Sequence, residues 1–141
     1  MADLAAKGGP RARPQYRNIH VSQLSQYRLP LAGIVSILHR VSGALLFLVG
    51  MPFLLYLFQQ SITSEISFER YRAVVSNPFA KLVLLALIWA YLHHFCAGIR
   101  YLFLDVHVGL AKEQARTSAA VVLGVSLALT AVVALKLFGV F

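Results

Sequence analysis

The apolar residues of the chain fall into three long segments, which are separated by two shorter polar stretches. The segments run from about Leu31 to Phe58, from about Ala80 to Leu104 and from about Ser118 to Phe138. A helix needs about 20 residues to cross the hydrocarbon core of a membrane. In lipid, a single spanning segment can satisfy its backbone hydrogen-bonding groups only as a helix. The pattern therefore predicts an all-α membrane protein with three transmembrane helices.

Residues at the joints between these segments are typical of helix ends. Pro30 stands where the first helix should begin, because the N–H that proline lacks has no partner at a helix start. Asn77 precedes the second segment, and asparagine is a preferred N-cap residue. Residues 59–79 and 105–117 are expected to form polar connections.

The composition favours lipid over water as the solvent of this chain. Hydrophobic residues make up 59% and charged residues 13%, whereas soluble domains are nearer to half apolar and a quarter charged. The net charge is +8, and several basic residues precede the first apolar segment: Lys7, Arg11, Arg13, Arg17 and Arg28. Such a segment marks the cytoplasmic side, so residues 1–30 are expected to be cytoplasmic and residues 31–141 to form one three-helix anchor domain. Nucleic-acid binding by the basic tail is not favoured, since no soluble part remains to contact a groove.

Polar residues interrupt the first two segments at a depth where they need a partner. They are Ser36, His39 and Arg40 in the first segment and His93 and His94 in the second. An ionisable side chain that faces lipid costs several kcal/mol, so these residues should face a cofactor, another chain or water. Because the two helices run antiparallel, His39 and His94 should reach a similar depth. Haem ligation, a proton path and a structural hydrogen bond all stay open for the two histidines.

Helical periodicity places some of these residues on common faces. Ser36, Arg40 and Gly43 follow one stripe of the first helix, and His94 and Gly98 follow one stripe of the second. A glycine one turn from a histidine leaves room for a flat macrocycle such as haem. The hydroxyl and guanidinium of the first stripe can hydrogen-bond a quinone carbonyl and stabilise the negative charge it gains on reduction.

His93 and His94 are neighbours and therefore lie about 100° apart around their helix. They cannot bind opposite sides of one iron, so a six-coordinate haem needs its second ligand from elsewhere, and another chain is the expected source. Cys96 is interpreted as a packing residue and Arg100 as an arginine that snorkels to the interface. The third segment carries only small hydroxyl side chains among its apolar residues and is interpreted as a packing helix.

Two motifs in these helices resemble the signatures of a known family. Residues 36–43 read Ser-Ile-Leu-His-Arg-Val-Ser-Gly, and residues 94–105 read His-Phe-Cys-Ala-Gly-Ile-Arg-Tyr-Leu-Phe-Leu-Asp. Together they resemble the larger, b-haem-bearing membrane anchor of succinate dehydrogenase, respiratory complex II. The resemblance covers about residues 13–141 and includes the three-helix layout.

The resemblance implies a helical bundle in which this chain and a second small anchor subunit share one haem b. It also implies a flavoprotein that oxidises succinate and an iron–sulfur subunit that passes the electrons to a quinone, with ubiquinone expected and menaquinone the alternative. Residue by residue, His94 corresponds to the axial ligand of the haem iron. Ser36 and Arg40 correspond to quinone-binding residues, and His39 and Arg40 to groups near the haem propionates.

Other functions stay open beside this one. They are the anchor of a quinol:fumarate reductase, a haem-free membrane scaffold and an ion or proton channel. A channel is disfavoured because it needs a continuous polar stripe, whereas the third segment has none and the first is apolar after Gly43. The expected location is the bacterial inner membrane, with the mitochondrial inner membrane as the alternative.

The basic N-terminal segment generates a test of topology. The N-terminus and the 105–117 connection should be cytoplasmic, and the 59–79 connection and the C-terminus should lie outside. Reporter fusions placed at Ser64 and at Phe141 should therefore both give the signal of an exported reporter. Cytoplasmic signals at both positions would contradict this orientation.

Overall fold

The structure is a computed structural model that describes residue 22 and residues 26–140. The basic residues up to Arg17 lie outside this described part, and of the basic N-terminal residues named above only Arg28 falls within it. Among the described residues, three helices are long and apolar enough to cross a membrane, namely Leu31–Thr63, Pro78–Asp105 and Lys112–Leu137. The prediction of an all-α fold with three spanning segments is thus confirmed for the described residues.

The first span is made of three consecutive pieces. Helix α2 (Leu31–Leu45) continues into a π-helical turn, η1 (Leu46–Gly50), and then into α3 (Met51–Thr63). Pro52 explains the wide turn, since a proline ring clashes with the carbonyl four residues back and supplies no N–H to it. The N–H of Met51 accordingly bonds the carbonyl of Leu46, five residues back. The span ends five residues later than the sequence suggested, at Thr63 rather than Phe58.

The stretch expected to be a polar connection contains a helix of its own, α4 (Glu65–Ser76). A reciprocal cap starts it: the N–H of Ser67 donates to the hydroxyl of Ser64 at 3.1 Å, and the N–H of Ser64 donates to the hydroxyl of Ser67 at 2.9 Å. Asn77 then caps α5 (Pro78–Asp105), because its side-chain oxygen accepts from the N–H of Phe79 at 2.8 Å. The predicted N-cap is confirmed.

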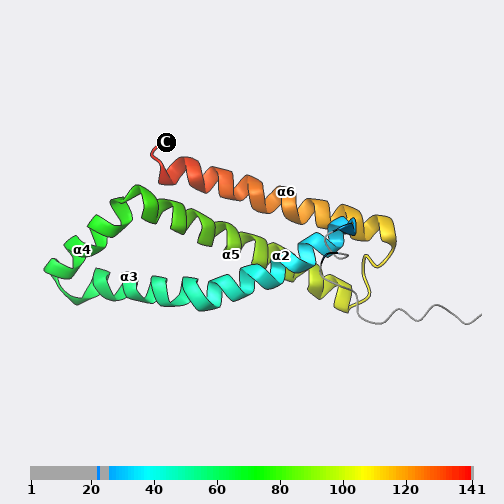
Figure 1. Ribbon diagram of the computed structural model, residues 1–141, viewed down its shortest axis with the longest axis horizontal. Helices are drawn as coiled ribbons and strands as arrows, with labels where there is room; N and C mark the ends of the chain where they lie inside the picture. Colours follow the sequence, from blue (N-terminus) through cyan, green and yellow to red (C-terminus); the bar gives the residue numbers. More distant parts are fainter. Residues whose placement is uncertain (1–21, 23–25, 141) are drawn as a thin grey trace, which may run out of the picture.

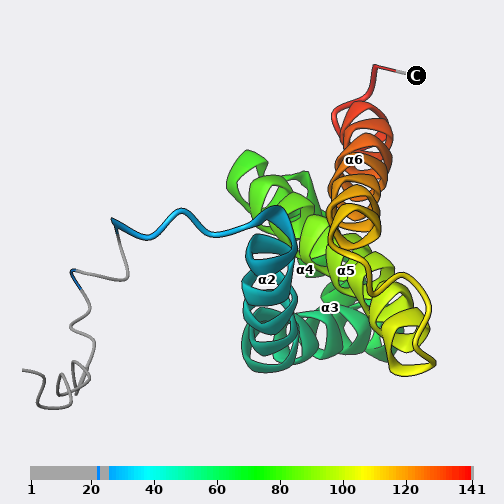
Figure 2. The same ribbon diagram turned by 90° about the vertical axis from the view of Figure 1, so that its right-hand side faces the viewer.

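Helix α5 is the centre of the arrangement. It lies between α2 on one side and α6 (Lys112–Leu137) on the other, and α2 and α6 also contact each other (Figures 1 and 2). Toward the other end, α3 diverges from α5, and α4 closes the gap (Figure 1). The buried cluster where α2, α5 and α6 meet consists of Val35, Ala97, Ala119 and Val122. Small residues at such contacts allow membrane helices to approach closely.

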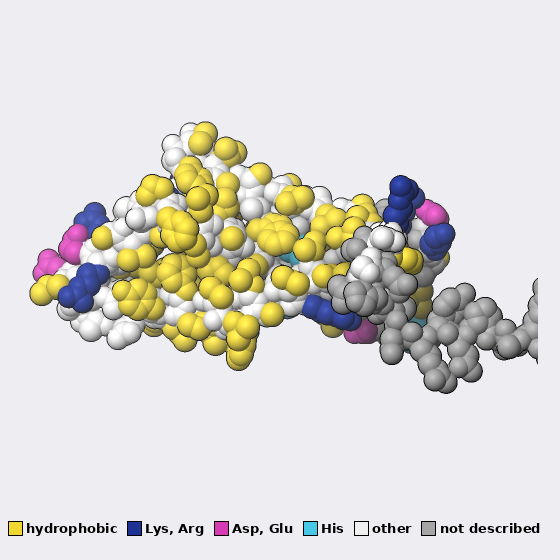
Figure 3. Space-filling view, in the orientation of Figure 1, with side chains coloured by type: hydrophobic (Ala, Val, Ile, Leu, Met, Phe, Trp, Pro, Cys, Tyr) yellow, Lys and Arg dark blue, Asp and Glu magenta, His cyan; other side chains and the backbone are white. Residues whose placement is uncertain are grey.

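The outer surface suits a lipid environment. Hydrophobic side chains cover the long flank of the molecule, and the charged side chains gather toward its two ends (Figure 3). Large apolar residues such as Phe47, Leu48 and Leu102 are more than 60% exposed. In water such a surface would drive association, so lipid or a partner subunit is its natural neighbour.

Arg100 does not snorkel to the surface as the sequence suggested. It is only 7% exposed. Its Nε donates to the hydroxyl of Ser118 at 2.9 Å, and its Nη2 donates to the carbonyl oxygen of Ala115 at 3.2 Å. Both acceptors belong to the first turns of α6, so the guanidinium fastens α6 to α5.

This contact predicts a loss of stability when the guanidinium is removed. Arg100→Met should lower the thermal stability of the detergent-solubilised assembly, because hydrogen bonds from a charged group contribute about 1.5–3 kcal/mol. Arg116→Met removes an exposed arginine from the same helix start and serves as the control, with little expected change. Equal melting temperatures for the two variants would contradict the role given to Arg100.

Candidate functional site

The crossing of α2 and α5 brings two of the intramembrane histidines into contact. The rings of His39 and His94 are stacked, with centroids 4.1 Å apart and planes 13° from parallel. The ring of Tyr101 lies 5.1 Å from that of His39. The expectation that His39 and His94 lie at one depth is confirmed, and together with Ser42 and Gly43 they form the histidine cluster described below.

Hydrogen bonds determine which nitrogen of His94 carries the proton. Its Nδ1 lies 3.0 Å from the carbonyl oxygen of His39 and 3.2 Å from the hydroxyl oxygen of Ser42. A carbonyl oxygen can only accept, so Nδ1 is the protonated, donating nitrogen. In the neutral ring Nε2 is then the nitrogen with a free lone pair, and no described residue bonds to it. A histidine that binds a metal has this arrangement.

One of the two glycines beside the cluster, Gly43, is required for its close packing. A Cβ atom added to Gly43 would lie 2.8 Å from Cε1 of His94, closer than packed side chains tolerate. A Cβ atom added to Gly98 would lie 3.8 Å from Nε2 of His39, an ordinary contact. The residue that makes room for the His94 ring is therefore Gly43 on the facing helix. The expectation that Gly98 leaves room for a haem concerns a different ring and stays a prediction.

His93 has a different environment from its neighbour. Its side chain is 0% exposed, and neither ring nitrogen makes a hydrogen bond of standard geometry with a described residue, although the Val35 backbone lies close enough to interact with the ring. Its ring stacks on that of Trp89, with centroids 5.4 Å apart and planes 24° from parallel. The indole nitrogen of Trp89 is likewise buried without a partner in the described part of the chain. His93 is thus enclosed within this chain, while His94 is only partly buried.

Ser36 and Arg40 take part in none of the contacts that hold the histidine cluster together. Arg40 is exposed and Ser36 is half-buried. Within the described residues neither side chain has a hydrogen bond or an ion pair. Most serines on these helices bond a carbonyl of their own helix, as Ser42, Ser61 and Ser126 do. The Ser36 hydroxyl and the Arg40 guanidinium are therefore both free to meet a group from outside the chain.

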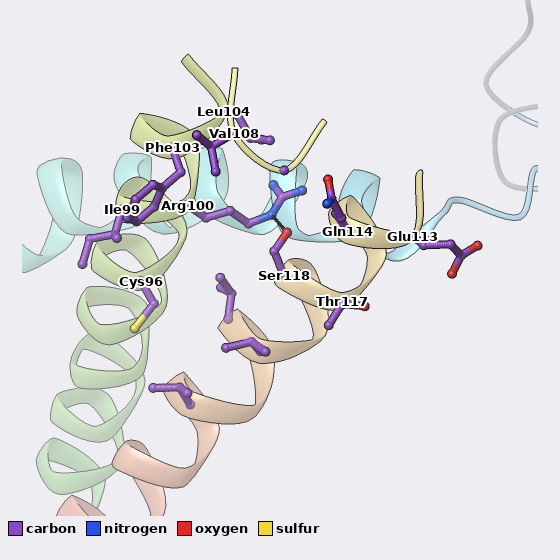
Figure 4. Close-up of a pocket in the computed structure, with 14 residues that line it drawn as sticks. Cys96, Ile99, Arg100, Phe103, Leu104, Val108, Glu113, Gln114, Thr117 and Ser118 are labelled. Carbon is purple, nitrogen blue, oxygen red and sulfur yellow. Dashed lines mark hydrogen bonds between the residues drawn. The ribbon is translucent and has the colours of Figure 1, made fainter. Parts of the chain in front are cut away.

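A separate cavity of about 740 Å³ opens between α5 and α6. Its walls are largely apolar and include Cys96, Phe103 and Val121, with Arg100 and Gln114 at the end near the loop (Figure 4). The guanidinium of Arg100 points toward Ser118 across this space (Figure 4). None of Ser36, His39, Arg40 and His94 lines it, and no feature of the sequence predicted this cavity.

The described residues contain no cluster of three or more His, Cys, Asp or Glu side chains that could hold a bare metal ion. A single available imidazole nitrogen between membrane helices is instead what a macrocycle that brings its own metal requires, since it needs only an axial ligand from each side. The fold defines a multi-pass membrane subunit, and the histidine cluster offers one imidazole nitrogen to such a group.

Comparison with known proteins agrees with this assignment to a membrane subunit. Residues 13–133 match the family described as succinate dehydrogenase/fumarate reductase transmembrane subunit, and the chain belongs to this family. It is 36% identical over 118 residues to the succinate dehydrogenase cytochrome b556 subunit of Paracoccus denitrificans, which covers 84% of this chain and 89% of the relative.

Two further relatives have the same description. The cytochrome b556 subunit of Coxiella burnetii is 36% identical over 104 residues, which are 73% of this chain and 82% of the relative. That of Rickettsia felis is 29% identical over 107 residues, with 76% and 82% covered. These names support a b-type cytochrome anchor of succinate dehydrogenase and do not favour the fumarate reductase alternative.

Proposed function

We propose that this succinate dehydrogenase anchor binds haem b through His94 and contributes Ser36 and Arg40 to the site where quinone is reduced. The observation that carries the proposal is the state of His94. Its Nδ1 is held by the His39 carbonyl at 3.0 Å, which leaves Nε2 unprotonated. The relatives' name, cytochrome b556 subunit, supports the same cofactor.

The residues present fit a haem that is shared between two chains. His94 would be the axial ligand from this chain, and a bound haem would supply one-electron redox chemistry. Ligands on opposite sides of an iron point at each other, whereas His39 and His94 are stacked face to face. This stacking argues against His39 as the opposite ligand and favours a histidine of the second anchor subunit. His39 and the exposed Arg40 would then meet the haem carboxylates, where a guanidinium pairs well with a carboxylate.

The quinone site would use the side chains of Ser36 and Arg40 on α2. Ser36 and Arg40 are one helical turn apart, and in the described residues neither has a partner to compete with a ligand. The hydroxyl can donate to a quinone carbonyl, and the guanidinium can stabilise the negative charge that develops there on reduction. The electrons would come from succinate through the flavoprotein and iron–sulfur subunits. We expect ubiquinone as the acceptor.

The remaining parts of the proposal concern the subunits and the membrane that would surround the chain. The exposed apolar flank would be covered partly by the second anchor subunit and partly by lipid. The membrane would be a bacterial inner membrane, with the N-terminal segment on the cytoplasmic side, where the iron–sulfur subunit would dock. Residues 31–141 would act as one anchor domain and residues 1–30 as its cytoplasmic extension.

Substitution of the two adjacent histidines tests the haem assignment. His94→Ala should abolish the low-spin spectrum of a bis-histidine haem, or the haem altogether, because it removes the axial ligand. His93→Ala should retain that spectrum, since His93 is enclosed within this chain. Reduced-minus-oxidised absorption spectra of the assembled complex measure both. The opposite pattern would move the ligand to His93, and a low-spin six-coordinate haem in this chain purified alone would contradict a shared haem.

Substitution of Ser36 and Arg40 tests the quinone assignment. Ser36→Ala and Arg40→Leu should slow quinone reduction roughly tenfold to a hundredfold, because a hydrogen bond to a group that gains charge contributes about 1.5–3 kcal/mol. Oxidation of succinate with a soluble artificial acceptor should persist. Ser61→Ala, at the other end of the same span, is the matched control.

Ser36→Ala is the cleaner of the two variants because Arg40 is also placed near the haem. Normal quinone turnover together with normal sensitivity to quinone-site inhibitors in Ser36→Ala would remove that serine from the site. Loss of activity with the soluble acceptor as well would indicate a defect of assembly, and the haem spectrum of the same sample reports it.

A further inference from the structure

Ser42 connects the two helices that carry the histidine cluster. Its side chain is 1% exposed. The hydroxyl oxygen lies 2.9 Å from the carbonyl oxygen of His39, three residues back on α2, and 3.2 Å from Nδ1 of His94 on α5. One buried hydroxyl therefore touches both the ring of His94 and the carbonyl that orients it.

The direction of each hydrogen bond follows from the chemistry of the three groups. The His39 carbonyl accepts only, so the Ser42 hydroxyl donates its proton to that oxygen. The lone pairs of the hydroxyl oxygen then face Nδ1 of His94, which also donates to the His39 carbonyl. The N–H of His94 is thus shared between two acceptors, and Ser42 supplies one of them.

We propose that Ser42 is a positioning residue that orients His94 as a haem ligand and lowers the reduction potential of the haem. The proposal rests on the proposed ligation by His94. An acceptor on the second ring nitrogen makes the ligating nitrogen more basic, and a more basic ligand favours the oxidised iron. Gly43, the next residue, permits the approach, because any side chain there would collide with the His94 ring.

The chain offers a matched comparison for this role. Ser126 on α6 is also fully buried, at 0% exposed, and its hydroxyl also bonds a carbonyl three residues back, that of Leu123 at 3.2 Å. The contact with an imidazole distinguishes Ser42 from Ser126. Removal of either hydroxyl should therefore cause a similar loss of packing and of backbone hydrogen bonding. Only removal of the Ser42 hydroxyl should change the properties of the haem.

The test is a redox titration of the haem in the purified four-subunit complex, followed at its α band. Ser42→Ala should raise the midpoint potential and weaken haem retention by about 10–100-fold, as is usual for loss of a group that supports a metal ligand. Ser42→Thr keeps a hydroxyl and should stay close to the unmodified protein. Ser42→Cys, a weaker acceptor of similar size, should shift the potential less than alanine and in the same direction. Ser126→Ala should leave the potential unchanged.

The outcomes separate this inference from the proposal on which it rests. A midpoint potential that is unchanged in both Ser42→Ala and Ser42→Cys would overturn the role of Ser42. A potential shift in Ser42→Thr or in Ser126→Ala as large as the shift in Ser42→Ala would overturn it too. If His94→Ala still loses the low-spin spectrum in those cases, the ligand assignment stands without Ser42. If His94→Ala keeps that spectrum, the ligand assignment itself is wrong and the inference falls with it.

Discussion

Hydrocarbon offers no water to a polar group, and this constraint organises the contacts between the helices. A polar side chain between spanning helices that lacks a partner costs several kcal/mol, so most of those in the described part of the chain are paired, with His93 as a buried exception. Arg100 finds its partners at the start of α6, and His94 finds its partners in the His39 carbonyl and Ser42. These two contacts fix α5 against both of its neighbours. The same constraint applies to His94. Its Nδ1 donates to the His39 carbonyl and to Ser42, whereas its Nε2 has no hydrogen-bond partner among the described residues. In hydrocarbon, a ring nitrogen without a partner costs free energy until a ligand binds it.

The close fit of the helices complements this polar matching. Ala97 and Ala119 are both 0% exposed, and Gly43 lies where no larger side chain would fit beside the His94 ring. Apolar attraction between helices is weak in lipid, so their association depends on close packing and on hydrogen bonds. In this chain the two occur at the same place, because the small residue that lets the helices approach also lets the histidine reach its acceptors.

Sequence predicted those parts of the structure that depend on one element at a time. Three apolar segments gave the three spans, and Asn77 gave the start of α5, because hydropathy and capping are local properties. Helix α4 was missed, since its polar composition resembles a loop and its start relies on the Ser64–Ser67 pair rather than on an acidic capping residue.

The depth of His39 and His94 could be counted along each helix, and the ring contact agrees with that count. The partners of Arg100 and the position of Gly43 opposite His94 could not be predicted, because they depend on how two packed helices are rotated about their axes. The spacing of Ser42, three residues after His39, was the available signal for its contact, but a serine in a membrane helix bonds its own backbone so often that the spacing alone says little.

The π-helical turn before Pro52 changes how helical faces should be followed along the first span. Such a turn accommodates one extra residue, so side chains beyond it are rotated by about 100° relative to an uninterrupted α-helix. A helical wheel drawn from Leu31 to Thr63 as a single helix would therefore assign the second half to the wrong faces. The stripe of Ser36, Arg40 and Gly43 does not continue in phase into α3, and it stops near the middle of the first span. Insertions or deletions of one residue within residues 46–50 should consequently re-aim α3 and α4 while the polar residues of α2 keep their alignment.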